Sequence, residues 1–145
     1  MITITVDTSQ LDRKLADIPA ALARAQRVAL LEIGNVVKKH AREAIKNPHL
    51  RPSTWEPRKK KYKHPPLLKT TNMWNSINSK VTGPDTVVVG TPHAYALYHQ
   101  HGTKHMPARP FFPIDEYGQL MPMVMDQITH KVQKAYKSEL DKLGG

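Results

Sequence analysis

The sequence predicts an α+β domain, in which a long N-terminal helix and a C-terminal helix pack on a small, mostly antiparallel sheet. Three observations lead to this prediction. Apolar residues recur at steps of three and four along residues 20–46 and again after Pro122, which is the spacing of an amphipathic helix. Between these segments, two runs rich in β-branched residues flank Gly83-Pro84-Asp85, a pattern typical of a hairpin.

The N-terminal segment predicts a strand followed by a short helix. Residues 2–6 alternate apolar and polar β-branched side chains with a period of two, as a half-buried strand does. A helix through Leu11 and Leu15 is expected to stop before Pro19. Proline fits the first turn of the next helix, where its missing N–H would be unpaired in any case.

The longest helical pattern covers residues 20–46. Its apolar stripe comprises Leu22, Ala25, Ala29, Ile33, Val36, His40 and Ala44, and is widened by Leu30, Val37, Ala41 and Ile45. Gly34 lies inside the stripe, where glycine costs a helix about 1 kcal/mol relative to alanine. We therefore expect Gly34 to permit the close approach of another backbone. Asn47-Pro48 ends the helix.

A long basic loop is predicted over residues 47–66, which hold five of the twelve prolines and show no apolar period. Loops of this length inside compact domains are usually functional or disordered. The stretch from Lys38 to Lys63 contains ten Lys/Arg and two Glu, so it carries +8 of the net charge of +10. Such a concentration favours a polyanion or an acidic protein surface as partner. The side chains expected to face it are Arg51, Arg58, Lys59, Lys60, Lys61 and Lys63.

Two alternatives stay open for this loop. It can be a solvated loop without a partner, as charged runs usually are. Trp55 and Tyr62 lie among the cations, and aromatic side chains in a basic segment suit base stacking. They suit equally well an anchor that pins the loop to the core.

The middle of the chain predicts short elements. Leu67 and Leu68 are expected to be buried, and Thr70 or Thr71 can cap a short helix with Met73, Trp74 and Ile77. Residues 78–82 and 86–90 form the predicted hairpin, with residues 87–89 apolar enough for a buried strand. The C-terminal helix is expected to place Val124, Ile128, Val132, Ala135 or Tyr136, and Leu140 on one face.

A proline-rich segment follows a short helix that opens near Tyr95 and ends at Gly102. The prolines at 107, 110 and 113 stiffen the backbone, and both phenylalanines of the chain lie here. Aromatic residues and arginine carry much of the binding energy at interfaces. The expected subunit or partner interface consists of Tyr95, Tyr98, Met106, Arg109, Phe111 and Phe112. Core packing is the alternative for at least one of the two phenylalanines.

Enzymatic and membrane classes receive little support. The absence of cysteine excludes disulfides, zinc–thiolate sites and thiol nucleophiles. No apolar run approaches the ~20 residues that span a bilayer, and no secretory signal, nucleophile elbow or phosphate loop is recognisable. We therefore expect no catalytic residues, no cofactor, no small-molecule substrate and no membrane association.

Four histidines surround the glycine turn, namely His93, His99, His101 and His105. Imidazole is a common metal ligand. However, His99 and His101 are two residues apart, which points them to different faces of a helix, and no carboxylate lies close by in the sequence. We expect surface histidines rather than a metal site.

Four pieces of the chain resemble, in the same order, the phage virion-morphogenesis, or tail-completion, family. They are Trp55-Glu56-Pro57, residues 67–77, residues 87–91, and the dense stretch from Tyr95-Ala96 through His99-Gln100 and Gly102 to residues 106–112. Thr71 stands where the family usually has glycine, and His101 where an aromatic is common. The first fifty residues match only as a strand followed by a long helix.

The resemblance implies a structural protein of a tailed phage or prophage, located in the virion and assembled in the bacterial cytoplasm. Such proteins act at the head–tail junction or tail terminus as rings, with a hexamer as the expected form. The implied partners are other copies of the chain, connector or tail-tube proteins, and passing DNA contacted without sequence preference. The alternative function is a cytosolic nucleic-acid-binding module that uses residues 38–63.

The length of the chain indicates its domain organisation. We expect residues 1–145 to form a single domain.

Overall fold

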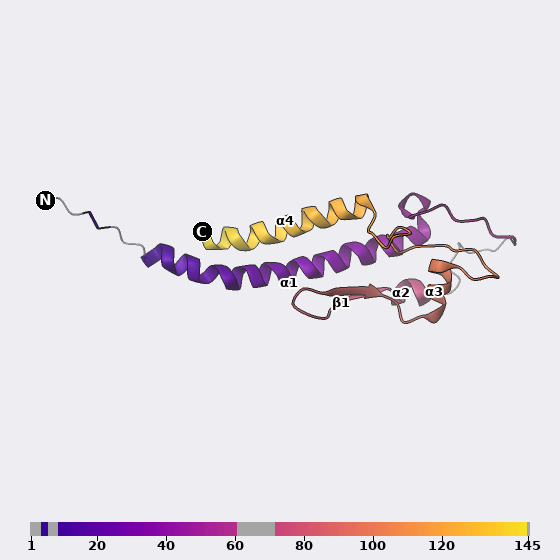
Figure 1. Cartoon of the computed structure of the whole chain (residues 1–145), viewed down its shortest axis with the longest axis horizontal. Coiled ribbons are helices and arrows are strands. Elements are labelled where there is room, and N and C mark those ends of the chain that lie inside the picture. Colours follow the sequence, from indigo (N-terminus) through magenta and orange to yellow (C-terminus); the bar gives the residue numbers. More distant parts are fainter. Residues whose placement is uncertain (1–3, 6–8, 61–71, 145) are drawn as a thin grey trace.

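The structure, a computed structural model, describes residues 4–5, 9–60 and 72–144. Its elements are α1 (Ser9–Lys46), the 3₁₀ helix η1 (Pro48–Leu50), α2 (Asn72–Ser76), β1 (Asn78–Val81), β2 (Val87–Gly90), α3 (Ala94–His101) and α4 (Pro122–Gly144). Helix α4 lies along one side of α1, and the β1–β2 hairpin lies along the other (Figure 1). The α+β prediction, with two long helices and a small antiparallel sheet, is confirmed.

Helix α1 is longer than predicted, because it runs unbroken from Ser9 through Pro19 to Lys46. The expected stop before Pro19 is therefore wrong. Pro19 is exposed, so water can bind the Leu15 carbonyl that loses its helical partner at this position. The prediction that a helix ends before a proline considers only neighbouring residues and not whether water can reach the unpaired carbonyl.

The predicted N-terminal strand is not seen where the structure describes it. Ile4 and Thr5 belong to no strand and are exposed, while residues 2, 3 and 6 lie outside the described residues. Tyr62, Leu67, Leu68, Thr70 and Thr71 also lie outside them. The short helix predicted to start at Thr70 or Thr71 is confirmed as α2, in which Met73 is buried.

Helices α1 and α4 pack along each other as an antiparallel pair (Figure 1). Helix α1 buries Ala21, Ala25 and Ala29, whose small side chains permit a close approach, and α4 buries Val124, Ile128 and Ala135. The predicted α4 face is wrong at its end, because Leu140 is exposed and Glu139 is buried. An ion pair with α1 makes the burial of this carboxylate possible.

The hairpin sits on α1 at Gly34. Its register pairs Asn78 with Gly90 and Val81 with Val87. A Cβ added to Gly34 would lie 2.9 Å from the Ser79 Cβ and 2.9 Å from the Val87 Cγ2. A close approach at this glycine is thus present, but the expected partner is wrong, because side chains of the hairpin come closest rather than a backbone.

Strand β2 is only half-buried, so the predicted buried strand over residues 87–89 is wrong. Val87 and Val89 are partly buried, whereas Val88 points to solvent. A two-stranded antiparallel sheet that packs one face on a helix leaves its other face in water.

The hydrophobic core surrounds the C-terminal half of α1. It consists of Ala41, Ala44, Ile45, Trp55, Met73, Ile77, Ala96 and Phe111, with Leu50, Trp74, Val89 and Phe112 packed against it. These side chains come from α1, the loop after it, α2, the hairpin, α3 and the proline-rich segment. No helix within the described residues is long and apolar enough to cross a membrane.

Candidate functional site

Helix α3 and the proline-rich segment form one compact corner because of Gly102. This residue takes a φ of 73°, and its N–H donates to the Tyr98 carbonyl at 2.7 Å. A Cβ here would lie 2.7 Å from the Ala108 backbone N. Only glycine suits both the positive φ and this contact. The predicted end of the helix at Gly102 is confirmed.

Hydrogen bonds fix the proline-rich segment against α3. The Arg109 N–H donates to the His99 carbonyl at 2.6 Å. The Gln100 Oε1 accepts from the Phe111 N–H at 3.0 Å and from the Phe112 N–H at 3.1 Å. The side chain of Gln100 thus pairs with two backbone N–H groups of the proline-rich segment, as the carbonyls of a neighbouring strand would. The prolines of this segment have no N–H to pair. The sequence pattern does not predict this role of Gln100, which contributes there only to the family resemblance.

The two phenylalanines have different surroundings. Phe111 is completely buried in the core, and its ring centroid lies 4.8 Å from that of Phe112. Phe112 is partly buried. The core-packing alternative therefore holds for Phe111, whose side chain does not reach the surface.

Helix α3 presents three large side chains to solvent, namely Tyr95, Leu97 and Tyr98. The ring of Tyr95 also lies against those of His93 and His99, with centroids 5.0 and 6.2 Å away. Tyr95 and Tyr98 belong to the predicted interface set, which does not include Leu97. The sequence did hold a signal for Leu97, because Tyr95 and Leu97 are two residues apart and so point to different faces of the helix.

An open, mostly apolar groove of about 620 Å³ runs beside these side chains. We call it the α3 groove. Its lining includes Val37 of α1, Val89 of β2, Ala96 and Leu97 of α3, and Phe112 and Ile114 of the proline-rich segment. The groove therefore lies where four parts of the chain meet. Exposed apolar surface of this kind commonly marks a site of protein–protein contact.

The basic loop is anchored to the core by Trp55. This residue is buried, and its Nε1–H donates to the Pro110 carbonyl at 2.8 Å. Arg51 lies 3.4 Å above the ring and donates to the Ala44 and Ile45 carbonyls at 2.7 and 2.9 Å. Burial lowers the pKa of the Arg51 guanidinium from its ordinary value. The anchor alternative thus holds for Trp55, whose covered ring cannot stack on a base.

Two more cations of the basic stretch hold α2 against α1. Arg42 donates to the Ile77 carbonyl at 2.6 Å, and its guanidinium lies 5.1 Å from the Trp74 ring centroid. The Lys46 Nζ lies 4.5 Å from the same centroid. Lys59 and Lys60 are exposed instead. The +8 stretch is therefore divided between cations that build the fold and cations that face solvent.

The remaining predicted site residues have varied positions. Met106 and Arg58 are partly buried, and Lys61 and Lys63 lie outside the described residues. Arg109 is partly buried and donates through Nη2 to the Glu56 carbonyl at 3.1 Å, which ties the basic loop to the proline-rich segment.

The histidines near Gly102 form no metal-binding cluster among the described residues. Burial, together with the charge of Arg109, lowers the pKa of His99. In the part of the chain that the structure describes, no three His, Asp or Glu side chains converge on a common point.

A comparison with protein families identifies the chain. The model of the phage virion morphogenesis family matches residues 6–133. The chain belongs to that family. The match includes α1, the hairpin, α3, the proline-rich segment and the first half of α4. No curated protein sequence and no solved structure matched the chain significantly.

Membership in the phage virion morphogenesis family gives the protein a role in assembling phage particles and associates it with the virion. The corner formed by α3 and the proline-rich segment combines exposed large side chains with an apolar groove.

Proposed function

We propose that the protein is a ring-forming subunit that completes the phage tail or joins the tail to the head. The family supports a role in virion assembly. The observation that carries the finer proposal is the exposed group Tyr95, Leu97 and Tyr98 beside the α3 groove. Large apolar side chains next to a concave apolar surface are typical of a binding interface.

A ring would suit both the proposed place at the tail end or head–tail junction and the positive charge of the protein. Subunits of one chain that bind head to tail close into a ring when the rotation between neighbours permits it, and we expect six subunits. Tail and connector proteins would bind the faces of this ring. The exposed Lys59 and Lys60 of the basic loop would line its channel and contact passing DNA through phosphates, without reading sequence.

The decisive experiment measures the mass of Tyr98→Ser by light scattering over a range of protein concentrations. Tyr98 is 51% exposed, so the substitution leaves the core intact. We expect wild-type protein to form a ring-sized species and the variant to lose at least tenfold in apparent association constant, because aromatic anchors commonly contribute more than about 1.4 kcal/mol.

The matched control is Tyr117→Ser, which changes the same residue type at a position that is 81% exposed and outside α3. This control should assemble as the wild type does. Equal assembly of Tyr98→Ser and wild type would show that α3 is not the interface. A wild type that stays monomeric at every concentration and with purified virion components would refute the ring.

A further inference from the structure

Strand β2 has an edge that no described strand covers. The Thr82 N–H donates to the Thr86 carbonyl at 3.0 Å, and in an antiparallel hairpin such hydrogen-bonded pairs alternate with pairs that are not hydrogen-bonded. Counted along the register, the backbone N–H and C=O groups of Val87 and Val89 therefore point away from β1. Among the described residues, no backbone group pairs with them.

The sequence of β2 leaves this edge unprotected. Proteins usually keep foreign strands away from an exposed edge with charged side chains or proline. Residues 87–90 are Val-Val-Val-Gly and offer neither. The α3 groove lies on the same side of the hairpin, because its lining includes Val89 and Gly90 but no residue of β1. The β2 edge is thus open to a further strand, next to an apolar hollow.

The N-terminal segment has the sequence of a strand. Residues 2–6 are all β-branched, and such residues are enriched in sheets. Of these residues, the structure describes Ile4 and Thr5, which belong to no strand, and Ile4 is 84% exposed. In an extended chain, Ile2, Ile4 and Val6 would share one face and the two threonines the other. The segment therefore offers an apolar face for the groove and a polar face for solvent.

The segment cannot reach the β2 edge of its own chain. The hairpin contacts α1 at Gly34, which lies about 38 Å along the helix from Ser9 at 1.5 Å per residue. A fully extended chain spans at most about 3.6 Å per residue, so even Ile2 stays within about 25 Å of Ser9. Figure 1 shows the hairpin beside the middle of α1, away from the N-terminal end of this helix. A strand that pairs with β2 must therefore come from another copy.

We propose that the N-terminal segment of one subunit, residues 2–6, adds as a third strand to the β2 edge of the next. This inference rests on the proposed self-assembly and names one contact that forms it. In strand addition, main-chain hydrogen bonds provide affinity and alternate side chains provide specificity. The two surfaces are different, so the contact is head to tail, the type that generates rings or open helical filaments.

The test introduces pairs of cysteines into the full-length chain, which has none of its own. Val88 is 53% exposed and thus marks the solvent face of β2, the face that the threonines of an added strand would share. Directly opposite residues have Cα atoms about 4.5–5.5 Å apart, which a disulfide can span. Val88→Cys is combined with Thr3→Cys in one variant and with Thr5→Cys in another, because either threonine can lie opposite Val88.

We expect at least one of these two variants to form disulfide-linked oligomers with oxidised glutathione. Non-reducing electrophoresis should show a ladder of linked subunits that returns to the monomer on reduction. The matched control is Ile4→Cys with Val88→Cys. Ile4 lies between the two threonines, and the period of two places it on the opposite face. The control should give about tenfold less linked product, because its two thiols lie on different faces of the sheet.

Two further variants complete the design. Val88→Cys alone should stay monomeric, because linked dimers would mean that the β2 edges of two copies pair with each other. Ile4→Asp should weaken association in light scattering at least tenfold, because a charge replaces an apolar side chain in the groove. Ile4 is exposed and outside α1, so this substitution leaves the fold intact, and circular dichroism should show equal helix content in all variants.

The outcomes separate this inference from the proposed function. Strand addition is overturned if neither threonine variant links, if the Ile4→Cys control links equally, or if the disulfide forms within one chain. The ring can still be supported in these cases by the Tyr98→Ser comparison. A ladder that continues far beyond a ring-sized species would support strand addition and refute a closed ring. A wild-type protein that never associates, in variants that never link, would overturn both.

Discussion

At the scale of single residues, Gly34 is the position where helix propensity and packing conflict. Glycine weakens a helix interior by about 1 kcal/mol relative to alanine. A methyl group here would come within 2.9 Å of both the Ser79 Cβ and the Val87 Cγ2. Overpacking of this kind costs roughly 1–3 kcal/mol. Packing therefore outweighs propensity, and the absence of a side chain at Gly34 lets the hairpin lie flat on α1.

We predict that Gly34→Ala lowers the free energy of unfolding by up to about 2 kcal/mol, the overpacking cost less the gain in helix propensity. Urea unfolding followed by circular dichroism measures this change. Gly90→Ala is the control, because nothing lies within 4 Å of a Cβ added there. An unchanged or raised stability of Gly34→Ala would show that the hairpin moves away from α1 at little cost.

At the scale of elements, the helices and the hairpin follow from periodicity, and each exception has its own physical cause. The stripe on residues 20–46, the hairpin turn and the stop at Gly102 each depend on residues close in sequence. Pro19 fits inside α1 because it lies on an exposed part of the helix, where water can bind a carbonyl that has lost its helical partner. Glu139 takes a buried position because Arg24, 115 residues away, pairs with it.

The candidate site shows the same division. The exposed Tyr95 and Tyr98 and the turn at Gly102 could be predicted from the sequence. The hydrogen bond from Trp55 to the Pro110 carbonyl joins residues 55 positions apart in the sequence, and the one from the Phe111 N–H to Gln100 joins residues 11 positions apart. No local pattern fixes such partners. The α3 groove was missed for this reason, since its lining comes from four separate parts of the chain.

The ion pair between α1 and α4 makes the stability of the protein depend on pH. Hydrogen bonds from Lys142 and Arg24 lower the pKa of Glu139 from its ordinary 4.5. A carboxyl whose pKa is lowered in the folded state stabilises that state above pH ~4.5, and the contribution is lost as the pH falls through the lower folded value. Wild-type stability should therefore fall in acid partly because Glu139 becomes protonated.

We predict that Glu139→Gln lowers the thermal midpoint at pH 7 and that the difference from wild type shrinks toward zero below the folded pKa of Glu139. Calorimetry at pH 7, 5 and 3 measures both effects. Asp126→Asn is the control, because Asp126 is an exposed acid on the same helix. A difference that persists unchanged at pH 3 would mean that Glu139 acts through packing rather than charge.

At the scale of the whole molecule, the charge is uneven along the chain. The net charge is +10, and the stretch from Lys38 to Lys63 alone carries +8. Arg42, Lys46 and Arg51 of this stretch contact Trp74 or Trp55 inside the fold, whereas Lys59 and Lys60 remain exposed. DNA contact in the proposed ring would thus depend on a few lysines.

We predict that the assembled protein binds duplex DNA without sequence preference and that Lys59→Glu with Lys60→Glu weakens this binding at least tenfold. Fluorescence anisotropy at 50 and 200 mM salt measures the affinity, which should fall steeply with salt because binding releases counterions. The control, Lys80→Glu with Lys134→Glu, makes the same change of net charge at exposed positions on β1 and α4. Equal losses in both variants would indicate a general charge effect rather than a DNA-facing loop.

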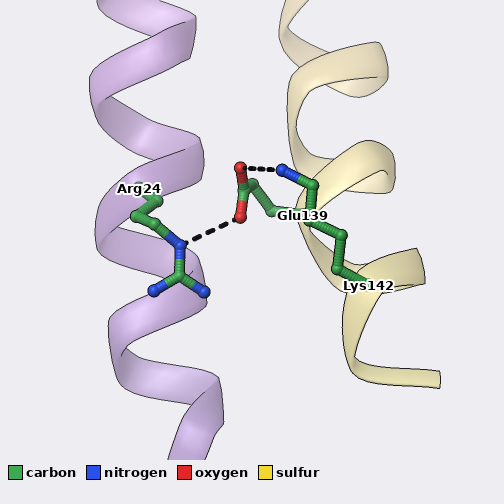
Figure 2. Close-up of polar contacts among 3 residues, drawn as sticks. All are labelled: Arg24, Glu139 and Lys142. Atoms are coloured by element: carbon green, nitrogen blue, oxygen red, sulfur yellow. Dashed lines mark hydrogen bonds and ion pairs between the residues drawn. The ribbon is translucent and has the colours of Figure 1, made fainter. Parts of the chain in front are cut away.

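The 38 residues of α1 make this helix about 57 Å long at 1.5 Å per residue, whereas the 23 residues of α4 cover about 35 Å. Helix α1 therefore continues past the end of α4 (Figure 1), beyond the Arg24–Glu139 ion pair that joins the two helices (Figure 2). One residue inserted between Arg24 and Gly34 would turn the ion pair by about 100° relative to the hairpin contact. The spacing along a single helix thereby sets how α4 and the hairpin are oriented relative to each other.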